Sequence, residues 1–276
     1  MAGGLSASFA QSDDTPARRR PRSQEFHIRA QERTGVLVPM YVYPANIHAN
    51  AAYNRLMDIK RRHETVPMWV IVNPASGPGK QVDANYSKAI DRLIGSGCMV
   101  LGYVSTRYAK RSEADVRKDI DLWRKLYPRT QGLFFDEMIS EDTEAGSKYQ
   151  ANLNRYAGEI GFWPTVANPG AETPGRYFAA EVADVIVVHE GDVWPKEERL
   201  AGDYFGGYAD YPPFTRAVLL YSQSAIDPQK LKTARRHVRW IYVTEDVYRP
   251  GDPKANNPWD TLSKHLDELC DQLSRP

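Results

Sequence analysis

The sequence has few cysteines, no long apolar run and no excess of charge of either sign. Two cysteines among 276 residues exclude a disulfide scaffold. We expect two buried free thiols, with a single bridge as the alternative. No apolar run reaches the roughly 18–20 residues of a membrane span. With 36 basic and 35 acidic residues, the net charge of +1 argues against a nucleic-acid partner that needs a globally basic surface, although a local patch stays compatible with it.

The first 34 residues differ from the rest of the chain. They carry six arginines among small and polar residues, and their few large apolar residues cannot offset the entropy of ordering the segment. We therefore expect residues 1–34 to form a flexible Arg-rich tail, solvated or in contact with phosphate or an acidic polymer. The apolar core of a secretory signal, about 7–15 residues long, is not recognisable there. Residues 35–276 are expected to form the functional domain.

Eight short apolar runs follow from Gly35 onward, separated by stretches with helical patterns. Most runs are almost continuously apolar, which is typical of parallel strands buried on both faces. Their starts lie about 20–33 residues apart, the length of one βα unit. The runs are Val36–Tyr43, Pro67–Asn73, Met99–Val104, Gly132–Asp136, Phe162–Asn168, Ala183–His189, Arg216–Tyr221 and Val238–Thr244.

Eight βα units predict a single (β/α)8 barrel. Between the runs, Ser112 begins a helical stripe that ends before Pro128, and a leucine stripe from Leu262 to Leu273 closes the chain. An open doubly wound sheet is the alternative, but the glycine-rich loop expected after its first strand is missing. The segment Ser76–Gly79 lacks the lysine of a phosphate loop and is predicted to be a tight turn.

In a barrel, the chemistry lies at the carboxyl ends of the strands. Asp136 and Glu137 directly follow the fourth strand, and Glu190 follows the sixth. Strand alternation points Asp136 and Glu137 in different directions, so we expect one of them to enter the barrel mouth. Two strand spacings give roughly 10 Å between backbones, which inward side chains shorten to the roughly 5–9 Å of a glycosidase carboxylate pair. Helix capping, or pairing with an arginine, is the alternative role for these acids.

The residues that other reaction types require are missing from the sequence. The six histidines show no metal-ligand spacing, so no metal and no cofactor is expected. No lysine lies inside a strand, as a Schiff-base enzyme requires, and no nucleophile elbow is present. His189 either orients Glu190 or is a core histidine. A lyase or isomerase of a phosphorylated metabolite would need a phosphate site after strands seven and eight, where Tyr221–Ser224 offers donors without a glycine-rich turn.

Aromatic and polar residues at the same rim are candidates for sugar binding, because aromatic faces stack on pyranose rings and amides bond to hydroxyls. An aromatic loop over 204–214 follows strand six, with packing under a long loop as the alternative role. The candidate binding residues are Tyr41, Tyr43, Asn73, Tyr103, Asn168, Trp194, Tyr221 and Asp246.

Four motifs in this order resemble the spherulation-specific (spherulin-four-like) family: Val38–Pro44, Ile71–Gly79, Val100–Thr106 and Phe134–Glu137. The resemblance implies a (β/α)8 barrel and a glycoside hydrolase that cuts α-1,4-linked galactosamine or N-acetylgalactosamine polymers, the cationic exopolysaccharides of biofilms and spore coats. It also implies a secreted or surface location.

Within that resemblance, Asp136 and Glu137 match the family's acidic pair after strand four, and Glu190 matches its acid after strand six. We expect Asp136 to act as nucleophile and Glu190 as acid/base, with exchanged roles as the alternative, while Glu137 holds substrate or tunes its neighbour. Surplus acids at the rim favour a cationic substrate chain. A non-catalytic carbohydrate-binding or coat protein on the same fold is the alternative function.

Overall fold

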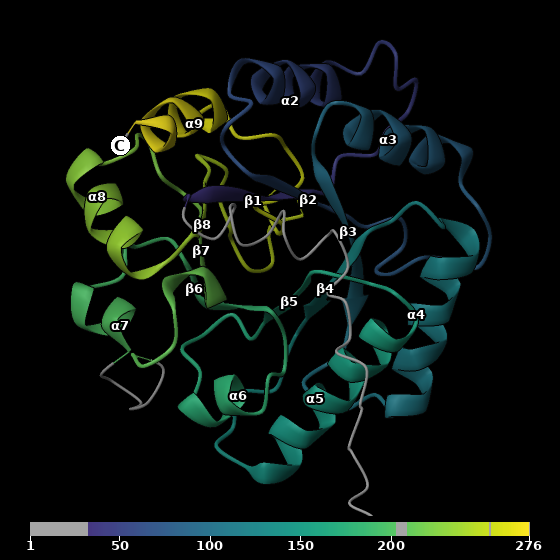
Figure 1. The fold of residues 1–276 in the computed structure, drawn as a ribbon. Helices are drawn as coiled ribbons and strands as arrows, with labels where there is room; N and C mark the ends of the chain where they lie inside the picture. Colours follow the sequence, from purple (N-terminus) through teal and green to yellow (C-terminus); the bar gives the residue numbers. More distant parts are fainter. Residues whose placement is uncertain (1–32, 203–208, 254, 276) are drawn as a thin grey trace, which may run out of the picture.

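The computed structural model describes residues 33–202, 209–253 and 255–275, in which eight parallel strands close into a barrel with helices around it (Figure 1). The predicted (β/α)8 barrel is confirmed, although the first strand ends at Met40 rather than Tyr43. The Arg-rich segment 1–32 lies outside the described residues. The strands are β1 Gly35–Met40, β2 Met68–Val72, β3 Met99–Ser105, β4 Gly132–Asp136, β5 Thr165–Asn168, β6 Val185–Gly191, β7 Arg216–Leu220 and β8 Trp240–Val243.

The helices lie on the outside of the barrel, and α9 completes the ring beside α2 and α8 (Figure 1). As predicted, Ser112 caps α4 by accepting a hydrogen bond from the Asp115 backbone, whereas Leu262 lies outside the last helix. No helix in the described ranges is both long and apolar enough to cross a membrane. The helical segments are α2 Ala51–Arg62, α3 Ala84–Gly95, α4 Glu113–Leu126, α5 Glu144–Glu159, α6 Gly175–Ala179, α7 Glu197–Ala201, η1 Pro213–Thr215, α8 Pro228–His237 and α9 Leu266–Ser274.

Aromatic rings close the amino-terminal end of the barrel. Trp69 of β2 and Trp240 of β8 stack with ring centroids 3.5 Å apart. Gly35 leaves room for them, because a Cβ atom there would lie 2.9 Å from the Trp240 ring. Cys98 and Cys270 are buried free thiols, as predicted, and burial raises their pKa values to about 11 and about 12.

The packing of α4 on β3 positions one side of the mouth. Trp123 of α4 lies directly on Gly102, where a Cβ atom would meet the indole ring at 2.6 Å. Its indole N–H donates to the backbone oxygen of Tyr103 at 2.8 Å. The carboxyl end of β3 is therefore held against α4, and with it the Tyr103 side chain, which points toward β4.

Candidate active site

A cavity of about 480 Å³ opens at the carboxyl ends of the strands. Three carboxylates line it, and among the described residues of its wall there is no lysine, arginine or histidine. We call this cavity the carboxylate cleft. Its lining consists of Tyr41, Tyr108, Asp136, Glu137, Asn168, Pro169, Gly170, Glu190, Tyr221, Tyr248, Asn256, Asn257, Pro258 and Trp259.

One amide joins the two acids that were predicted to be catalytic. Asn168 Nδ2 donates to Asp136 Oδ1 at 2.9 Å and to Glu190 Oε2 at 2.6 Å, so these two oxygens lie at most 5.5 Å apart. The orientation of the amide follows from its other end, where Oδ1 accepts the backbone N–H of Gly170 at 2.9 Å. Strands four, five and six thus each contribute one member of a compact polar group.

The two carboxyl groups differ in their hydrogen bonds. Burial raises the pKa of Asp136, but the Tyr103 hydroxyl, the Glu137 backbone N–H and Asn168 all donate to it and oppose that rise. Burial and then the charge of Asp136 raise the pKa of Glu190 to about 7. Because their surroundings differ, the two carboxyl groups differ in proton affinity. Such a pair is suited to two roles near neutral pH, one for an ionised carboxylate and one for a protonated carboxylic acid.

Glu190 reaches the barrel axis because β6 contains a β-bulge. Regular alternation from the inward-facing Val185 would direct His189 toward the axis and Glu190 away from it. The pairing of β6 with β7 shifts by one residue between Val187 and His189, so that Glu190 takes the inward position. His189 lies outside the cleft, with Nε2 2.8 Å from the backbone oxygen of Val193, and burial lowers its pKa. It therefore hydrogen-bonds to the loop and not to Glu190.

Glu137 enters the cleft because it leaves the strand conformation. Its φ of 54° lies in the left-handed region, so its side chain does not continue the alternation of β4. The Thr106 hydroxyl and the Tyr108 backbone N–H both donate to the Glu137 backbone oxygen, at 2.7 and 2.6 Å, and hold this turn. One of Asp136 and Glu137 was expected to enter the mouth, and in the structure both line the cleft.

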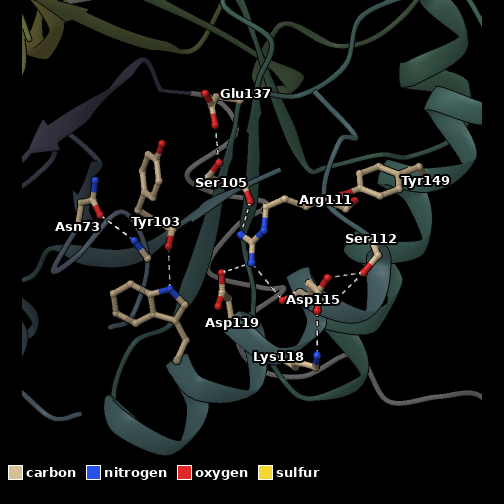
Figure 2. Close-up of polar contacts among 12 residues, drawn as sticks. Asn73, Tyr103, Ser105, Arg111, Ser112, Asp115, Lys118, Asp119, Glu137 and Tyr149 are labelled. Atoms are coloured by element: carbon tan, nitrogen blue, oxygen red, sulfur yellow. Dashed lines mark hydrogen bonds and ion pairs between the residues drawn. The ribbon is translucent and has the colours of Figure 1, made fainter. Parts of the chain in front are cut away.

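A polar chain from α4 holds the Glu137 side chain (Figure 2). The Ser105 hydroxyl donates to Glu137 Oε2. The Ser105 backbone oxygen in turn accepts from Arg111 Nη1 at 2.7 Å, and Arg111 forms an ion pair with Asp119 at 2.7 Å. Arg111 therefore has no direct contact with Glu137. It holds the end of β3, and its charge is paired with Asp119 outside the barrel. The group that holds the Glu137 carboxylate is the neutral hydroxyl of Ser105.

The connection between β8 and α9 forms one wall of the cleft, and none of its lining residues was predicted from the sequence. Trp259 packs edge-on against Tyr221, with ring centroids 6.0 Å apart, and its side chain hydrogen-bonds to Glu190. Tyr248 packs against the same Tyr221 ring at 6.1 Å. The signal was present in Asn256-Asn257-Pro258-Trp259, but the prediction considered only residues adjacent to each strand end. Tyr108, on the opposite loop, was missed for the same reason.

Most of the predicted site residues meet at the cleft. Tyr103 lies directly behind it, and its hydroxyl donates to Asp136 Oδ2 at 2.7 Å. The predicted residues that line the cleft are Asp136, Glu137, Glu190, Tyr41, Asn168 and Tyr221.

Two predicted binding residues near β1 and β2 lie outside the lining. Tyr43 is half exposed, and its hydroxyl donates to Asp83 at 2.9 Å. Asn73 Oδ1 accepts the backbone N–H of Gly77 at 3.0 Å, which closes the predicted tight turn (Figure 2). Both side chains serve local structure.

Two further predicted residues also lie elsewhere. Trp194 is buried and lines a separate cavity together with His189. Asp246 accepts a hydrogen bond from the Thr261 hydroxyl at 2.8 Å and ties together the two ends of the β8–α9 connection. In the aromatic loop predicted over 204–214, residues 204–208 lie outside the described residues.

Two solved structures that are similar to this chain share its barrel fold. A GH113 β-1,4-mannanase aligns over 88% of this chain and 99% of its own, with a TM-score of 0.52 and 12% identity, a likeness of fold. Sph3 of Aspergillus clavatus, whose crystal structure contains GalNAc, aligns over 88% and 98%, with a TM-score of 0.73 and 27% identity. The protein is thus a TIM barrel with a carboxylate-lined cleft at the carboxyl ends of its strands.

Its family follows from the sequence comparison. The model of spherulation-specific family 4 matches residues 35–273, and the chain belongs to this family. Spherulin-4 of Physarum polycephalum is 32% identical over 167 residues, which are 59% of this chain and 47% of that protein. The aligned stretch therefore spans about half the length of this curated relative.

Proposed function

We propose that the protein is a glycoside hydrolase that cuts within polymers of α-1,4-linked galactosamine or N-acetylgalactosamine. The observation that carries this proposal is the half-buried pair of Asp136 and Glu190 joined by Asn168. Glycosidases flank the scissile bond with two carboxyl groups, about 5–5.5 Å apart in retaining enzymes and about 6.5–9.5 Å apart in inverting ones. The upper limit of 5.5 Å between the bridged oxygens favours the retaining reaction.

The hydrogen bonds of the two acids support the roles that we propose for them. Asp136, with three donors, is the nucleophile: one carboxylate oxygen bonds to the anomeric carbon as the glycosidic C–O bond breaks. Glu190, with its pKa raised to about 7, gives its proton to the departing oxygen. Glu190 then takes a proton from water, whose oxygen displaces Asp136 from the anomeric carbon and restores both groups. Glu137, held by Ser105, faces the same space and is assigned to substrate binding.

Two features support an amino sugar as substrate. The carboxylate cleft has three acidic side chains and no basic one among its described wall residues, which favours a cationic chain. Sph3, to which this chain is similar over nearly its full length, was crystallised with GalNAc. Tyr41, Tyr221 and Trp259 present rings and polar atoms at the wall where pyranose faces would stack.

The test is product mass spectrometry on partly deacetylated α-1,4-galactosaminogalactan. We expect oligosaccharides of several lengths from the wild type. Turnover should be lowered by orders of magnitude in Asp136→Asn and Glu190→Gln, while both variants still fold and melt cooperatively. Asp91→Asn, on an exposed ion pair with Arg129, is the matched control and should cut normally.

Near-normal cleavage by Asp136→Asn or Glu190→Gln would refute the assigned roles. An intact polymer with the wild type would refute hydrolysis of this glycan, and a pull-down on the same polymer would then identify a non-catalytic binding protein. Release of monosaccharide alone would refute cleavage within the chain.

A further inference from the structure

A second cavity, of about 710 Å³, lies at the opposite end of the barrel from the carboxylate cleft. Part of its wall comes from the residues that precede β1, β2 and β8, and the rest comes from α8 and from the end of α9. We call it the basic cleft, because its described lining contains no acid and six cationic residues: Arg33, Lys232, Arg235, Arg236, Arg239 and Arg275.

Two of these cations are held in place by neutral partners. Arg239 Nη1 donates to the backbone oxygen of Arg235 at 2.6 Å. Arg235 in turn donates to the backbone oxygens of Gln272 at 3.2 Å and Arg275 at 2.8 Å. Both guanidinium groups are half-buried, and burial together with the charge of Arg235 lowers the pKa of Arg239. Carbonyl oxygens at helix ends position these groups but supply only partial negative charge.

The other four cations are exposed, and acids balance only two of them. Arg236 pairs with Glu197 at 2.9 Å, and Arg275 pairs with Asp271. Arg33 and Lys232 form no ion pair within the described part of the chain. Within the described residues, only two of the six lining cations form an ion pair with an acid, in a chain whose net charge is +1.

We propose that the basic cleft binds a ligand that carries at least two adjacent phosphate groups. Guanidinium groups bind phosphate through paired N–H donors, and lysine adds a mobile point charge. Cations from two helices and from the segment before β1 surround the cavity, so a single phosphate would contact only part of the set. Because the cleft lies at the opposite end of the barrel, a phosphate chain bound there leaves the carboxylate cleft open.

The probe is tripolyphosphate, titrated calorimetrically into the protein at low ionic strength, with orthophosphate and long-chain polyphosphate as comparison ligands. The test variant is Arg33→Glu/Lys232→Glu, because neither side chain caps a helix. The matched control is Lys125→Glu/Lys148→Glu, which makes the same charge change at exposed sites on α4 and α5. Thermal melts establish that both variants are folded.

We expect tripolyphosphate to bind the wild type and the control with equal affinity, within about twofold, and the test variant at least about tenfold more weakly. Orthophosphate should bind much more weakly than tripolyphosphate. If long-chain polyphosphate binds no more tightly than tripolyphosphate, per three phosphate groups, the ligand of the cleft is a short free anion. If the long chain binds much more tightly, the ligand is a polymer.

Absence of binding to the wild type, equal weakening in both charge variants, or equal affinity for orthophosphate would each overturn the proposal. Cleavage of the galactosamine polymer by the test variant should match the wild type. A failure of the phosphate experiment is therefore separate from a failure of the proposed glycosidase activity.

Discussion

Single residues decide which acid is protonated. Asp136 and Glu190 share one donor, Asn168, yet their other partners differ. Tyr103 donates only to Asp136 and favours its charged form, whereas Asp136 itself is a negative charge beside Glu190. The difference in proton affinity therefore arises from the neighbours of two chemically similar side chains.

This difference predicts a bell-shaped dependence of kcat/KM on pH. On the alkaline side, activity should fall with a midpoint near pH 7, because Glu190 must hold a proton and its pKa is about 7. On the acidic side it should fall where Asp136 becomes protonated, above the ordinary value of 3.8. The measurement is the initial rate of cleavage of a soluble oligosaccharide across this range.

Glu190→Gln is the control for that profile. Its residual activity should lack the alkaline limb while it keeps the acidic one. An alkaline limb that persists unchanged in this variant would assign that ionisation to another group, and the roles of the two acids would have to be exchanged or abandoned.

The sequence predicted the positions of the acids better than their directions. Asp136 and Glu190 lie at the carboxyl ends of apolar strands, and a barrel brings all such ends to one rim. The direction of the Glu137 side chain depends on a left-handed backbone conformation at this residue. No glycine or asparagine stands at this position to predict it from the sequence. The bridge through Asn168 depends on the Gly170 N–H that orients its amide, a contact made only once the loop after β5 has folded.

At the scale of elements, the strands were predictable but the bulge in β6 was not. All eight runs are strongly apolar, and burial on both faces leaves little else that such runs can form. The same feature hides the bulge, because Val185–Val188 is apolar at every position and no break in alternation marks an added residue. The partner strand β7, distant in sequence, sets the register.

The β8–α9 connection yields a second test of the site. Its Trp259 donates to Glu190 and thereby lowers the pKa of that acid against the effect of burial. Trp259→Phe removes this donor and keeps an aromatic ring against Tyr221 and Tyr242. We expect the alkaline limb of kcat/KM to move to higher pH, as measured with the same oligosaccharide.

Tyr248→Phe is the matched change on the same connection, because Tyr248 packs on Tyr221 and has no direct hydrogen bond to Glu190 in the described structure. Its alkaline limb should coincide with that of the wild type. Equal shifts in both variants would indicate a general change in the loop instead of the loss of one hydrogen bond.

On the scale of the whole molecule, the barrel separates stability from chemistry. The stacked Trp69 and Trp240 and the two buried thiols lie toward the amino-terminal end, while two acids with raised pKa values lie at the carboxyl end. Buried ionised carboxylates oppose folding. The free energy of unfolding should therefore decrease as the acids of this site ionise.

The stability of the protein should consequently depend on the protonation of Glu190. Its pKa is 4.5 in an unfolded chain and about 7 in the folded one, so the folded state binds this proton more tightly. The resulting stabilisation is fully present below about pH 4.5 and is lost as the pH rises through about 7. Its size is at most about 3 kcal/mol.

Glu190→Gln cannot lose this proton and should lack that dependence. Between about pH 5 and about pH 8, its Tm should rise relative to that of the wild type by several degrees, at roughly 2–4 °C per kcal/mol. Calorimetric melts of both proteins across this range give the comparison, and Glu159→Gln, at an exposed position at the end of α5, should follow the wild type. Parallel Tm curves for wild type and Glu190→Gln would mean that Glu190 ionises as readily in the folded protein as in the unfolded chain, and the proton-donor role would lose its physical basis.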